Sequence, residues 1–445
     1  MDADSTKVDA DAEVAAARRS DQIRLLKWYY LLAGANTAFA QCTFGGGMFP
    51  LYLKELGLSA QRIGALMGVI PFMQVLALFA TPLIERLGYR RSYLLFYGSR
   101  KFTIMALILA PWVLSIFGTG ALFRFVAACI LLFGVQRALG ETAYYPWLKE
   151  VVPDSIRGRA QGMANLCGAL ASGVGFGLAG FFVDYSGDLG LGRFGGFQAG
   201  YFFFACVGLV GIASAMRMVG GQPVERHPDR PPFLNRLREA ARDRRFLMFL
   251  VGAGVLQGSA TVFGTFMALY ARELLGIPSG TVVQMSIATM AGGVTTGYLW
   301  GRAADQYGSR RILILLFSLL ACMPLAWMWL PSLPAAAMLP ATAVAYFLFG
   351  GMFFGAMAAS FRLMYNSIIR EEKKGEYLAI RYAVVGIIAG SMPTLAGQSV
   401  GLFEGIGGSY LGLPLTPFTP LFAILAAVWA GTAWLFSRIR ESGDG

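Results

Sequence analysis

Long apolar segments recur along the whole chain, and they constrain its fold more than any other feature. A helix needs about 20 apolar residues to cross the hydrocarbon core of a bilayer. Strand alternation is absent, and transmembrane barrels do not carry apolar runs of this length. With 445 residues, 56% of them hydrophobic, the chain is predicted to be an all-α integral membrane protein with twelve transmembrane helices. The predicted spans are residues 28–53, 63–84, 93–117, 122–145, 162–183, 197–218, 246–270, 282–304, 312–330, 338–361, 378–403 and 418–436.

Basic residues are distributed unevenly between the two sides that these spans define. Of the 37 Lys and Arg residues, four lie in loops on one side, and most of the others lie on the side of the termini. Because positively charged loops stay inside, the tails 1–27 and 439–445 are predicted to be cytoplasmic, in a multi-pass protein of the plasma membrane. The net charge of +12 therefore reports topology and does not indicate a nucleic-acid site. The N-terminal tail lacks the apolar core of a signal peptide.

Short sequence strings recur at a fixed distance, which indicates an internal duplication. The string L-Y-x-[K/R]-E-L occupies residues 51–56 and returns 218 positions later at 269–274. Duplication on this scale is typical of transporters. We expect an N-terminal six-helix bundle at 28–219, a basic cytoplasmic linker at 220–245 and a C-terminal six-helix bundle at 246–438. Residues 233–245 of the linker fit either an amphipathic helix on the inner leaflet or a solvated connection.

Two of the predicted helices are rich in glycine. Small residues at such spacing let helices approach closely and slide against each other. The fifth and eleventh helices are therefore predicted to pack tightly against neighbours. Their glycines are Gly168, Gly173, Gly175, Gly177 and Gly180 in the fifth, and Gly386, Gly390, Gly397 and Gly401 in the eleventh.

A second repeat places charged residues around a tight turn on the cytoplasmic side. In residues 301–311 an acid ends one apolar segment, a glycine follows three positions later, and an arginine pair opens the next segment. Residues 81–91 repeat this order. The acid lies at the negative end of its own helix dipole and needs a positive partner, while glycine lets the chain reverse. We predict that both copies form a cytoplasmic gate. Its residues are Glu85, Gly88, Arg90, Arg91, Gly301, Asp305, Gly308, Arg310 and Arg311.

The later copy, G-x-x-x-D-x-x-G-x-R-R, closely resembles the cytoplasmic signature loop of the major facilitator superfamily. The earlier copy departs from the pattern at Thr81 and Glu85. The resemblance implies two pseudo-symmetric six-helix bundles that rock about a central cavity, with helices 1, 4, 7 and 10 as its lining. The predicted cavity residues on those helices are Asn36, Gln41, Thr43, Arg137, Glu141, Gln257, Thr261, Tyr346 and Phe354.

Glu141 is a carboxylate clearly inside a predicted span. Placing an ionisable side chain within the bilayer costs about 2.5 kcal/mol or more. Such a residue is therefore expected to have a functional role. We predict that Glu141 carries a coupling proton, being neutral in one state and ionised against Arg137 in the other. The alternative is that Arg137 pairs with Glu85 in the gate and Glu141 neutralises it. Arg100 and Lys101 lie at a similar depth and are expected to snorkel to the inner face or to pair with Glu141.

The chain lacks the motifs of an enzyme. No metal, nucleotide or nucleophile motif is present, and the sole histidine, His227, lies in the linker. The five cysteines lie in apolar spans without metal-ligand spacing, so we expect no metal and no cofactor. We predict a monomeric, proton-coupled secondary transporter, either a symporter or an exporter, for a small organic solute. The alternatives are an uncoupled facilitator or lipid flippase, and then a membrane sensor without turnover. Cations near the N-terminal wall favour an anionic or zwitterionic solute, although snorkelling explains them equally well.

Overall fold

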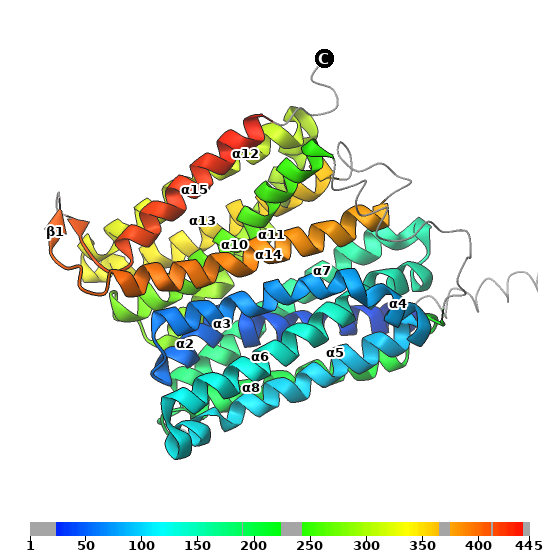
Figure 1. Cartoon of the computed structure of the whole chain (residues 1–445), viewed down its shortest axis with the longest axis horizontal. Helices are drawn as coiled ribbons and strands as arrows, with labels where there is room; N and C mark the ends of the chain where they lie inside the picture. Colours follow the sequence, from blue (N-terminus) through cyan, green and yellow to red (C-terminus); the bar gives the residue numbers. More distant parts are fainter. Residues whose placement is uncertain (1–23, 189, 224–242, 365–373, 411–412, 439–445) are drawn as a thin grey trace, which may run out of the picture.

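Bundled helices make up almost all of the structure, a computed structural model (Figure 1). It describes residues 24–188, 190–223, 243–364, 374–410 and 413–438. Two short strands, β1 (Ser409–Tyr410) and β2 (Leu413–Pro414), pair antiparallel in the loop before the last helix. The fold is therefore of the predicted all-α membrane class, with this hairpin as a small addition. Most of the linker helix expected at 233–245 lies outside the described residues.

The N-terminal half of the described chain begins with a helix at residues 24–44, which breaks at Gly45, Gly46 and Gly47. At Gly118, φ is 75° and ψ is −179°, a conformation that suits glycine, and it separates residues 110–117 from the next pass at 119–151. The further elements of this half are α2 (Met48–Glu55), α3 (Ala60–Phe72), η1 (Met73–Leu76), α4 (Ala77–Leu87), α5 (Tyr89–Ala106), η2 (Leu107–Leu109), α6 (Ala110–Val151), α7 (Asp154–Asp184) and α8 (Gly195–Met216).

The C-terminal half repeats this order of helices. It begins at Asp243, whose Oδ1 accepts hydrogen bonds from the backbone N–H groups of Arg245 at 3.0 Å and Phe246 at 3.1 Å. This cap satisfies two donors that a helix start would otherwise leave free. The elements of this half are α10 (Arg244–Glu273), α11 (Ser279–Tyr307), α12 (Ser309–Trp329), η3 (Leu330–Ser332), α13 (Ala335–Leu363), α14 (Lys374–Leu402) and, after the hairpin, α15 (Thr419–Ser437).

Apolar helices long enough to cross a bilayer account for most of the described chain. By length and composition, nine stretches of the described residues qualify. One of them, 89–151, contains the break at Gly118 and therefore supplies two passes. The helices at 24–55 and α11 are not among the nine, yet they run within the same bundle (Figure 1). This arrangement is consistent with the twelve predicted spans.

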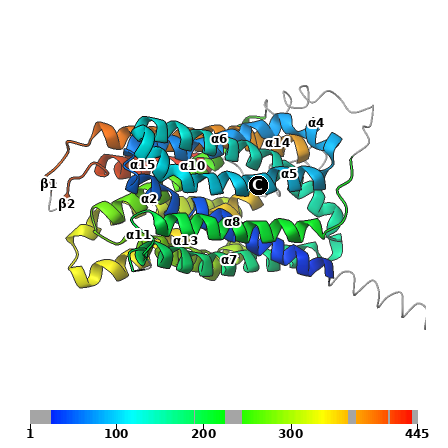
Figure 2. The same ribbon diagram turned by 90° about the horizontal axis from the view of Figure 1, so that it is seen from below.

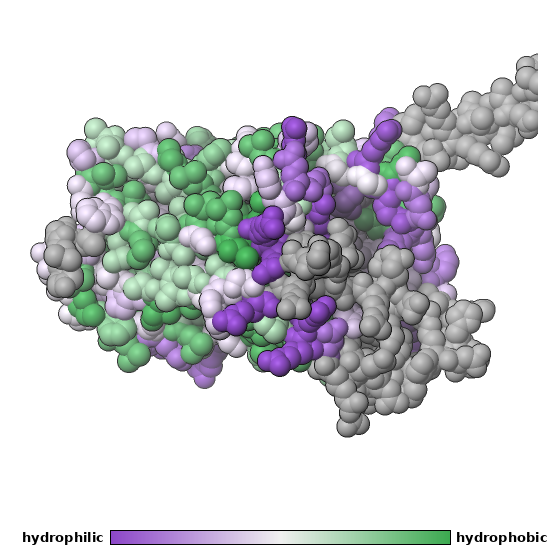
Figure 3. All heavy atoms as spheres, turned by 90° about the horizontal axis from the view of Figure 1, so that it is seen from above, coloured by the Kyte–Doolittle hydropathy of each residue, from purple (hydrophilic) through white to green (hydrophobic). Residues whose placement is uncertain are grey.

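The bundle has two chemically different ends. We call the end at which α4 and α11 finish, at Gly88 and Gly308, the basic end, and the end that carries β1 and β2 the hairpin end. The first and last described helices, residues 24–44 and α15, have their outer termini at the basic end (Figures 1 and 2). On the face shown in Figure 3, hydrophilic side chains gather toward this end, while much of the remaining surface is apolar.

Two equivalent arginines make the same contact in the two halves. Arg90 Nη2 donates a hydrogen bond to the carbonyl oxygen of Met216 at 2.6 Å, and Arg310 Nη2 donates one to that of Ser437 at 2.6 Å. Met216 and Ser437 are the last residues of α8 and α15. A cation there meets the negative end of a helix dipole and satisfies free carbonyls. The duplication read from the sequence therefore extends to tertiary contacts.

Glycines let the two halves pack closely. The helix α3 packs along α14, and α7 packs along α11. A Cβ atom on Gly397 would lie 2.6 Å from the carbonyl oxygen of Ala60 and 3.1 Å from the Cα of Gly64. Gly180 and Gly280 face each other in the same way between α7 and α11, and a Cβ on either would collide with the backbone of the other. The glycine-rich helices thus pack tightly, as predicted, and they do so across the boundary between halves.

Candidate functional site

A cavity of about 600 Å³ lies between the two halves. It is lined by the helix at 24–44, by α3, α5, α6 and α7 of the N-terminal half, and by α10, α11 and α13 of the C-terminal half. This volume is in the range of sites that bind small organic molecules. The helices that the family resemblance implied as its lining are all present, and α3, α5, α7 and α11 contribute as well.

Eight of the nine predicted cavity residues line this space. They are Asn36, Gln41, Arg137, Glu141, Gln257, Thr261, Tyr346 and Phe354. The prediction is wrong for Thr43, which is fully buried and donates a hydrogen bond from Oγ1 to the carbonyl oxygen of Phe39 at 2.6 Å. A threonine in a helix commonly bonds back to the residue four positions earlier. Thr43 therefore faces the packed interior of the N-terminal half.

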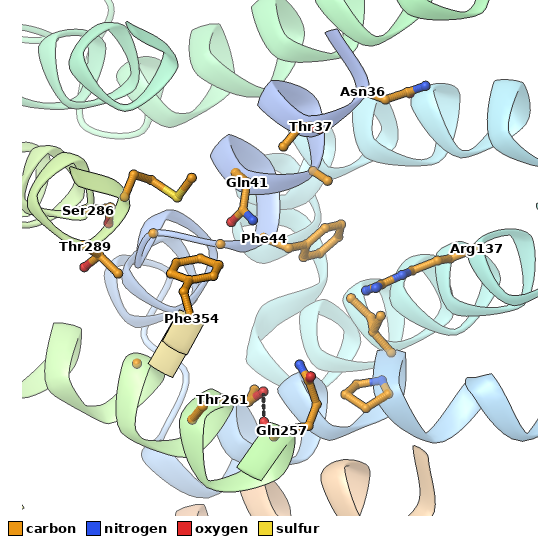
Figure 4. A pocket seen from close by; sticks show the side chains of 18 of the residues that line it. Asn36, Thr37, Gln41, Phe44, Arg137, Gln257, Thr261, Ser286, Thr289 and Phe354 are labelled. Carbon is orange, nitrogen blue, oxygen red and sulfur yellow. Dashed lines mark hydrogen bonds between the residues drawn. The ribbon is translucent and has the colours of Figure 1, made fainter. Parts of the chain in front are cut away.

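Polar and aromatic side chains converge on the middle of the cavity. In Figure 4, Gln41, Arg137 and Phe354 point toward one another from three different helices. No hydrogen bond joins the side-chain amide of Gln41 or Gln257 to another residue in the described part of the chain. Thr261 is less available, because its Oγ1 donates to the carbonyl oxygen of Gln257 at 2.9 Å. Two amides from opposite halves are thus positioned to hydrogen-bond a solute.

Arg137 and Glu141 form an ion pair one helical turn apart on α6. Arg137 Nε lies 3.3 Å from Glu141 Oε2, and the two side chains are 36% and 24% exposed. The alternative pairing of Arg137 with Glu85 is not the arrangement seen here. Because α6 places both groups on one face, the pair lines the cavity directly.

Arg100 and Lys101 on α5 are the charged residues for which the sequence prediction was wrong. They are 3% and 0% exposed, so neither snorkels to the inner face. Neither pairs with Glu141: Lys101 Nζ donates to Asn36 Oδ1 at 2.7 Å, and the guanidinium of Arg100 lies 3.6 Å from the ring centroid of Tyr97. Arg100 also lines the cavity. The sequence signal that could have indicated their burial was the depth of both residues within a predicted span.

Tyr97 reaches its position because α6 has a glycine beside it. The Tyr97 ring occupies the space where a Cβ on Gly140 would lie. Gly140 falls between Arg137 and Glu141 in the sequence, so the ring is inserted beside the ion pair while Arg100 covers its face. Asn36 supports the same cluster, since its Nδ2 donates to Tyr93 Oη at 2.6 Å. Its amide is therefore committed to Lys101 and Tyr93 and serves to position them.

The opposite wall, on α13, is aromatic. Phe349 and Phe353 stack with ring planes 10° apart and centroids at 5.9 Å, and Phe353 meets Phe354 edge to face at 5.3 Å. Tyr346 lies beside them, and its buried hydroxyl has no hydrogen-bond partner within the described residues. The cavity therefore has a charged wall from the N-terminal half that faces an aromatic wall from the C-terminal half.

Reciprocal ion pairs join the two halves at the hairpin end. Lys54 Nζ lies 2.7 Å from Glu273 Oε1, and Arg272 Nη2 lies 3.4 Å from Glu55 Oε1. The four residues belong to the repeated L-Y-x-[K/R]-E-L string, so each copy supplies a cation to the acid of the other. We call these four residues the hairpin-end gate. The repeated string indicates duplication in the sequence, but its spacing alone does not reveal that the two copies contact each other.

A helix N-terminus adds to the closure at the same end. Asp184, the last residue of α7, accepts a hydrogen bond from the backbone N–H of Gly280 at 2.6 Å and another from Thr281 Oγ1 at 2.9 Å. Gly280 lies in the first turn of α11, where free N–H groups and the helix dipole favour a carboxylate. Among the described residues, this contact and the ion pairs of the hairpin-end gate join the two halves at the hairpin end.

The predicted cytoplasmic gate lies at the basic end, with partners that the sequence did not reveal. Asp305 forms an ion pair with Arg362 of α13, within its own half. Among the described residues Glu85 has no ion pair. Arg90 and Arg310 cap helices instead of pairing with these acids, while Arg91 and Arg311 are exposed. Gly88 and Gly308 lie at the turns as expected, whereas Gly301 lies within α11.

Comparison with known proteins gives one family and several structural relatives. The profile of the Major Facilitator Superfamily matches residues 30–394. No curated protein matches the chain significantly. A mutant of the nucleoside transporter NupG is similar in structure, with a TM-score of 0.68 and 11% identity over 94% of this chain and 100% of that chain. A bacterial homologue of the iron transporter ferroportin has a TM-score of 0.65 and 12% identity, over 94% and 98% of the two chains. A bacterial homologue of the human lysosomal transporter Spinster has a TM-score of 0.60 and 14% identity, over 96% and 99%.

Proposed function

Because the chain belongs to the major facilitator superfamily, we propose that it is a secondary active transporter that moves a small organic solute across the membrane by alternating access. The observation that carries this proposal is the cavity between duplicated halves, closed toward one end by reciprocal ion pairs. Two rigid halves that rock about a central site would expose that site to each side in turn. The fold itself does not select a substrate, since one fold hosts many functions.

The proposed orientation places the basic end in the cytoplasm. Most Lys and Arg residues are expected there, which follows the tendency of positive loops to stay inside. Cavity residues toward this end include Tyr145, which is 52% exposed, and the Arg137–Glu141 pair, whose side chains are 36% and 24% exposed. The hairpin-end gate closes the opposite side. The structure would then correspond to a state that is accessible from the cytoplasm.

Glu141 is the proposed proton carrier. It is the sole carboxylate among the described residues that line the cavity, and its partner Arg137 lies within 3.3 Å. Protonation would release Arg137, and ionisation would restore the pair, so the charge of the site would change with the side to which it opens. A proton that moves down a 100 mV potential supplies about 2.3 kcal/mol, enough for roughly fiftyfold accumulation of a solute.

An uncoupled facilitator or a lipid flippase is the second candidate. The aromatic wall formed by Phe349, Phe353 and Phe354 favours it, because this wall could hold an apolar chain. A sensor without turnover is a third. Uptake by proteoliposomes separates the candidates: accumulation that follows an imposed pH gradient supports coupling, equilibration without dependence on that gradient supports a facilitator, and binding without uptake supports a sensor.

A further inference from the structure

We propose that the cavity selects an organic anion, whose single carboxylate or phosphate group binds Arg100 and whose apolar body lies against the aromatic wall of α13. This inference rests on the proposed function and names the class of solute for the same site. It depends on three observations: the charge balance of the cavity, the incomplete bonding of Arg100, and the separate use of Lys101.

Positive charge exceeds negative charge in the cavity. Among the described residues that line it, Arg100 and Arg137 are cationic and Glu141 is anionic. Lys101 lies directly behind the lining, where it is fully buried, and it does not enter this balance. Because Glu141 is already paired with Arg137, no carboxylate of the described lining is left for Arg100. An anion that enters the cavity would restore the balance at a depth where an unbalanced charge is costly.

Arg100 is held by rings and has no polar partner in the described residues. Its guanidinium carbon lies 3.6 Å from the ring centroid of Tyr97, 5.2 Å from that of Phe39 and 5.6 Å from that of Phe133. Its Nε is buried without a hydrogen-bond partner, and the whole residue is 3% exposed. Rings attract the face of a guanidinium but leave its in-plane N–H donors unused. Those donors form a planar fork that matches the two oxygens of a carboxylate or phosphate.

Lys101 is bonded in a different way, which leaves Arg100 as the binding group. Its Nζ donates to Asn36 Oδ1 at 2.7 Å, and the Asn36 amide then donates to Tyr93 Oη at 2.6 Å. This chain of hydrogen bonds directs Lys101 away from the solute.

The aromatic wall selects the apolar body of the solute, as Arg100 selects its anionic group. Phe353 and Phe354 lie on α13, across the cavity from the charged wall, and Gln41 and Gln257 lie between the two walls with free amides. An inorganic anion would leave this surface unfilled. A solute with an anionic group at one end and an aromatic or aliphatic body at the other would satisfy both walls.

A charge series of otherwise similar probes tests the inference. The thermal stability of purified protein is measured with 3-phenylpropionate, with its neutral amide, with 3-phenylpropylamine, and with benzyl phosphate as the phosphate arm. A ligand stabilises a protein according to its concentration relative to its dissociation constant. We expect stabilisation by one or both anions and none by the amide or the amine. Stabilisation by the neutral or cationic probe, or by no anion at all, overturns the inference.

Variants connect the binding to Arg100. Arg100→Gln should weaken anion binding about tenfold or more, because it removes a charge-assisted hydrogen bond. Arg100→Lys keeps the charge but loses the planar fork of N–H donors. Its affinity for the anion should therefore lie between those of the unaltered protein and of Arg100→Gln. Arg124→Gln is the matched control, since Arg124 is exposed on α6 and does not line the cavity. Equal anion affinity in Arg100→Gln and Arg124→Gln contradicts the proposal. If Arg100→Gln does not fold, Arg100→Lys tests the role of Arg100. The charge series on the unaltered protein still tests the selection of anions.

Two further experiments identify the source of the anion and test the proposed function independently of anion selection. Stabilisation by a short-chain phosphatidic acid, with no response to either free anion, contradicts a soluble solute and identifies a lipid headgroup as the ligand. Uptake of radiolabelled 3-phenylpropionate or its amide by proteoliposomes is then measured. Uptake of the amide alone would sustain transport and refute anion selection, whereas anion binding without any uptake would sustain the site and refute transport.

Discussion

Gly88 and Gly308, 220 positions apart, adopt the same backbone conformation, with φ of 84° and 86° and ψ of 148° and 146°. This region of the Ramachandran map is essentially restricted to glycine. Each residue ends one membrane helix and starts the next, with no intervening loop. The turn of the signature motif therefore has the same backbone geometry in both halves of the chain.

Gly308→Ala is expected to destabilise the protein by about 1–3 kcal/mol, because alanine cannot adopt this conformation without strain. Gly301→Ala, in the same motif, is the control: Gly301 is helical and a Cβ there meets no atom within 4 Å. That substitution should be neutral or slightly stabilising, since alanine is the better helix former. Thermal denaturation in detergent measures both. Equal melting temperatures for the two variants would show that the turn is not constrained.

Reversal of one charge in the hairpin-end gate should favour opening at that end. The side chains of Lys54 and Glu273 are 39% and 32% exposed, so screening limits their pair to about 0.5–1 kcal/mol, a two- to fivefold shift in population. Lys54→Glu should raise the reactivity of a cysteine placed at Gln41 toward an impermeant reagent added from the hairpin side, in a background without native cysteines. Combination with Glu273→Lys should reverse this change. A double variant as reactive as the single one would argue against the reciprocal gate.

Asp305→Asn is expected to disfavour the state that opens to the cytoplasm and to slow transport, because it removes an ion pair that is present in that state. Asp305 pairs with Arg362, and both are partly exposed, so a change of about two- to fivefold in rate is expected. Arg362→Gln should produce the same effect, because it removes the same pair. Arg302→Gln, an exposed cation on the same helix, is the control. Unchanged uptake together with unchanged cysteine accessibility in Asp305→Asn would contradict the gating role.

Glu141→Gln should abolish the dependence of uptake on a pH gradient, because the amide cannot exchange a proton. Exchange of labelled solute across the membrane without a gradient should persist, since the cavity stays open to it. Asp188→Asn, at an exposed position in the loop before α8, controls for the loss of a carboxylate. Proteoliposomes with an imposed pH gradient provide the measurement. Gradient-driven accumulation that survives in Glu141→Gln would assign coupling to another group.

Part of the site could be predicted from the sequence, because it depends on the spacing of residues along one helix. Arg137 and Glu141 lie one turn apart, which fixes their common face without knowledge of any neighbour. The partner of Arg100 could not be predicted in this way. Its contact with Tyr97 depends on the side of α5 that meets α6, and on the space that Gly140 leaves there.

The sequence by itself determined the apolar, helical character of the chain, its repeated strings and the turns at Gly88 and Gly308, because hydrophobic length and repeated strings are local properties of the chain. Only the tertiary structure decided which charges meet. Lys54 and Glu273 are 219 positions apart, and Asp305 and Arg362 are 57 apart. An ion pair depends on distances of a few ångströms between helices, and helical periodicity fixes the direction of a side chain but not the neighbour that it faces.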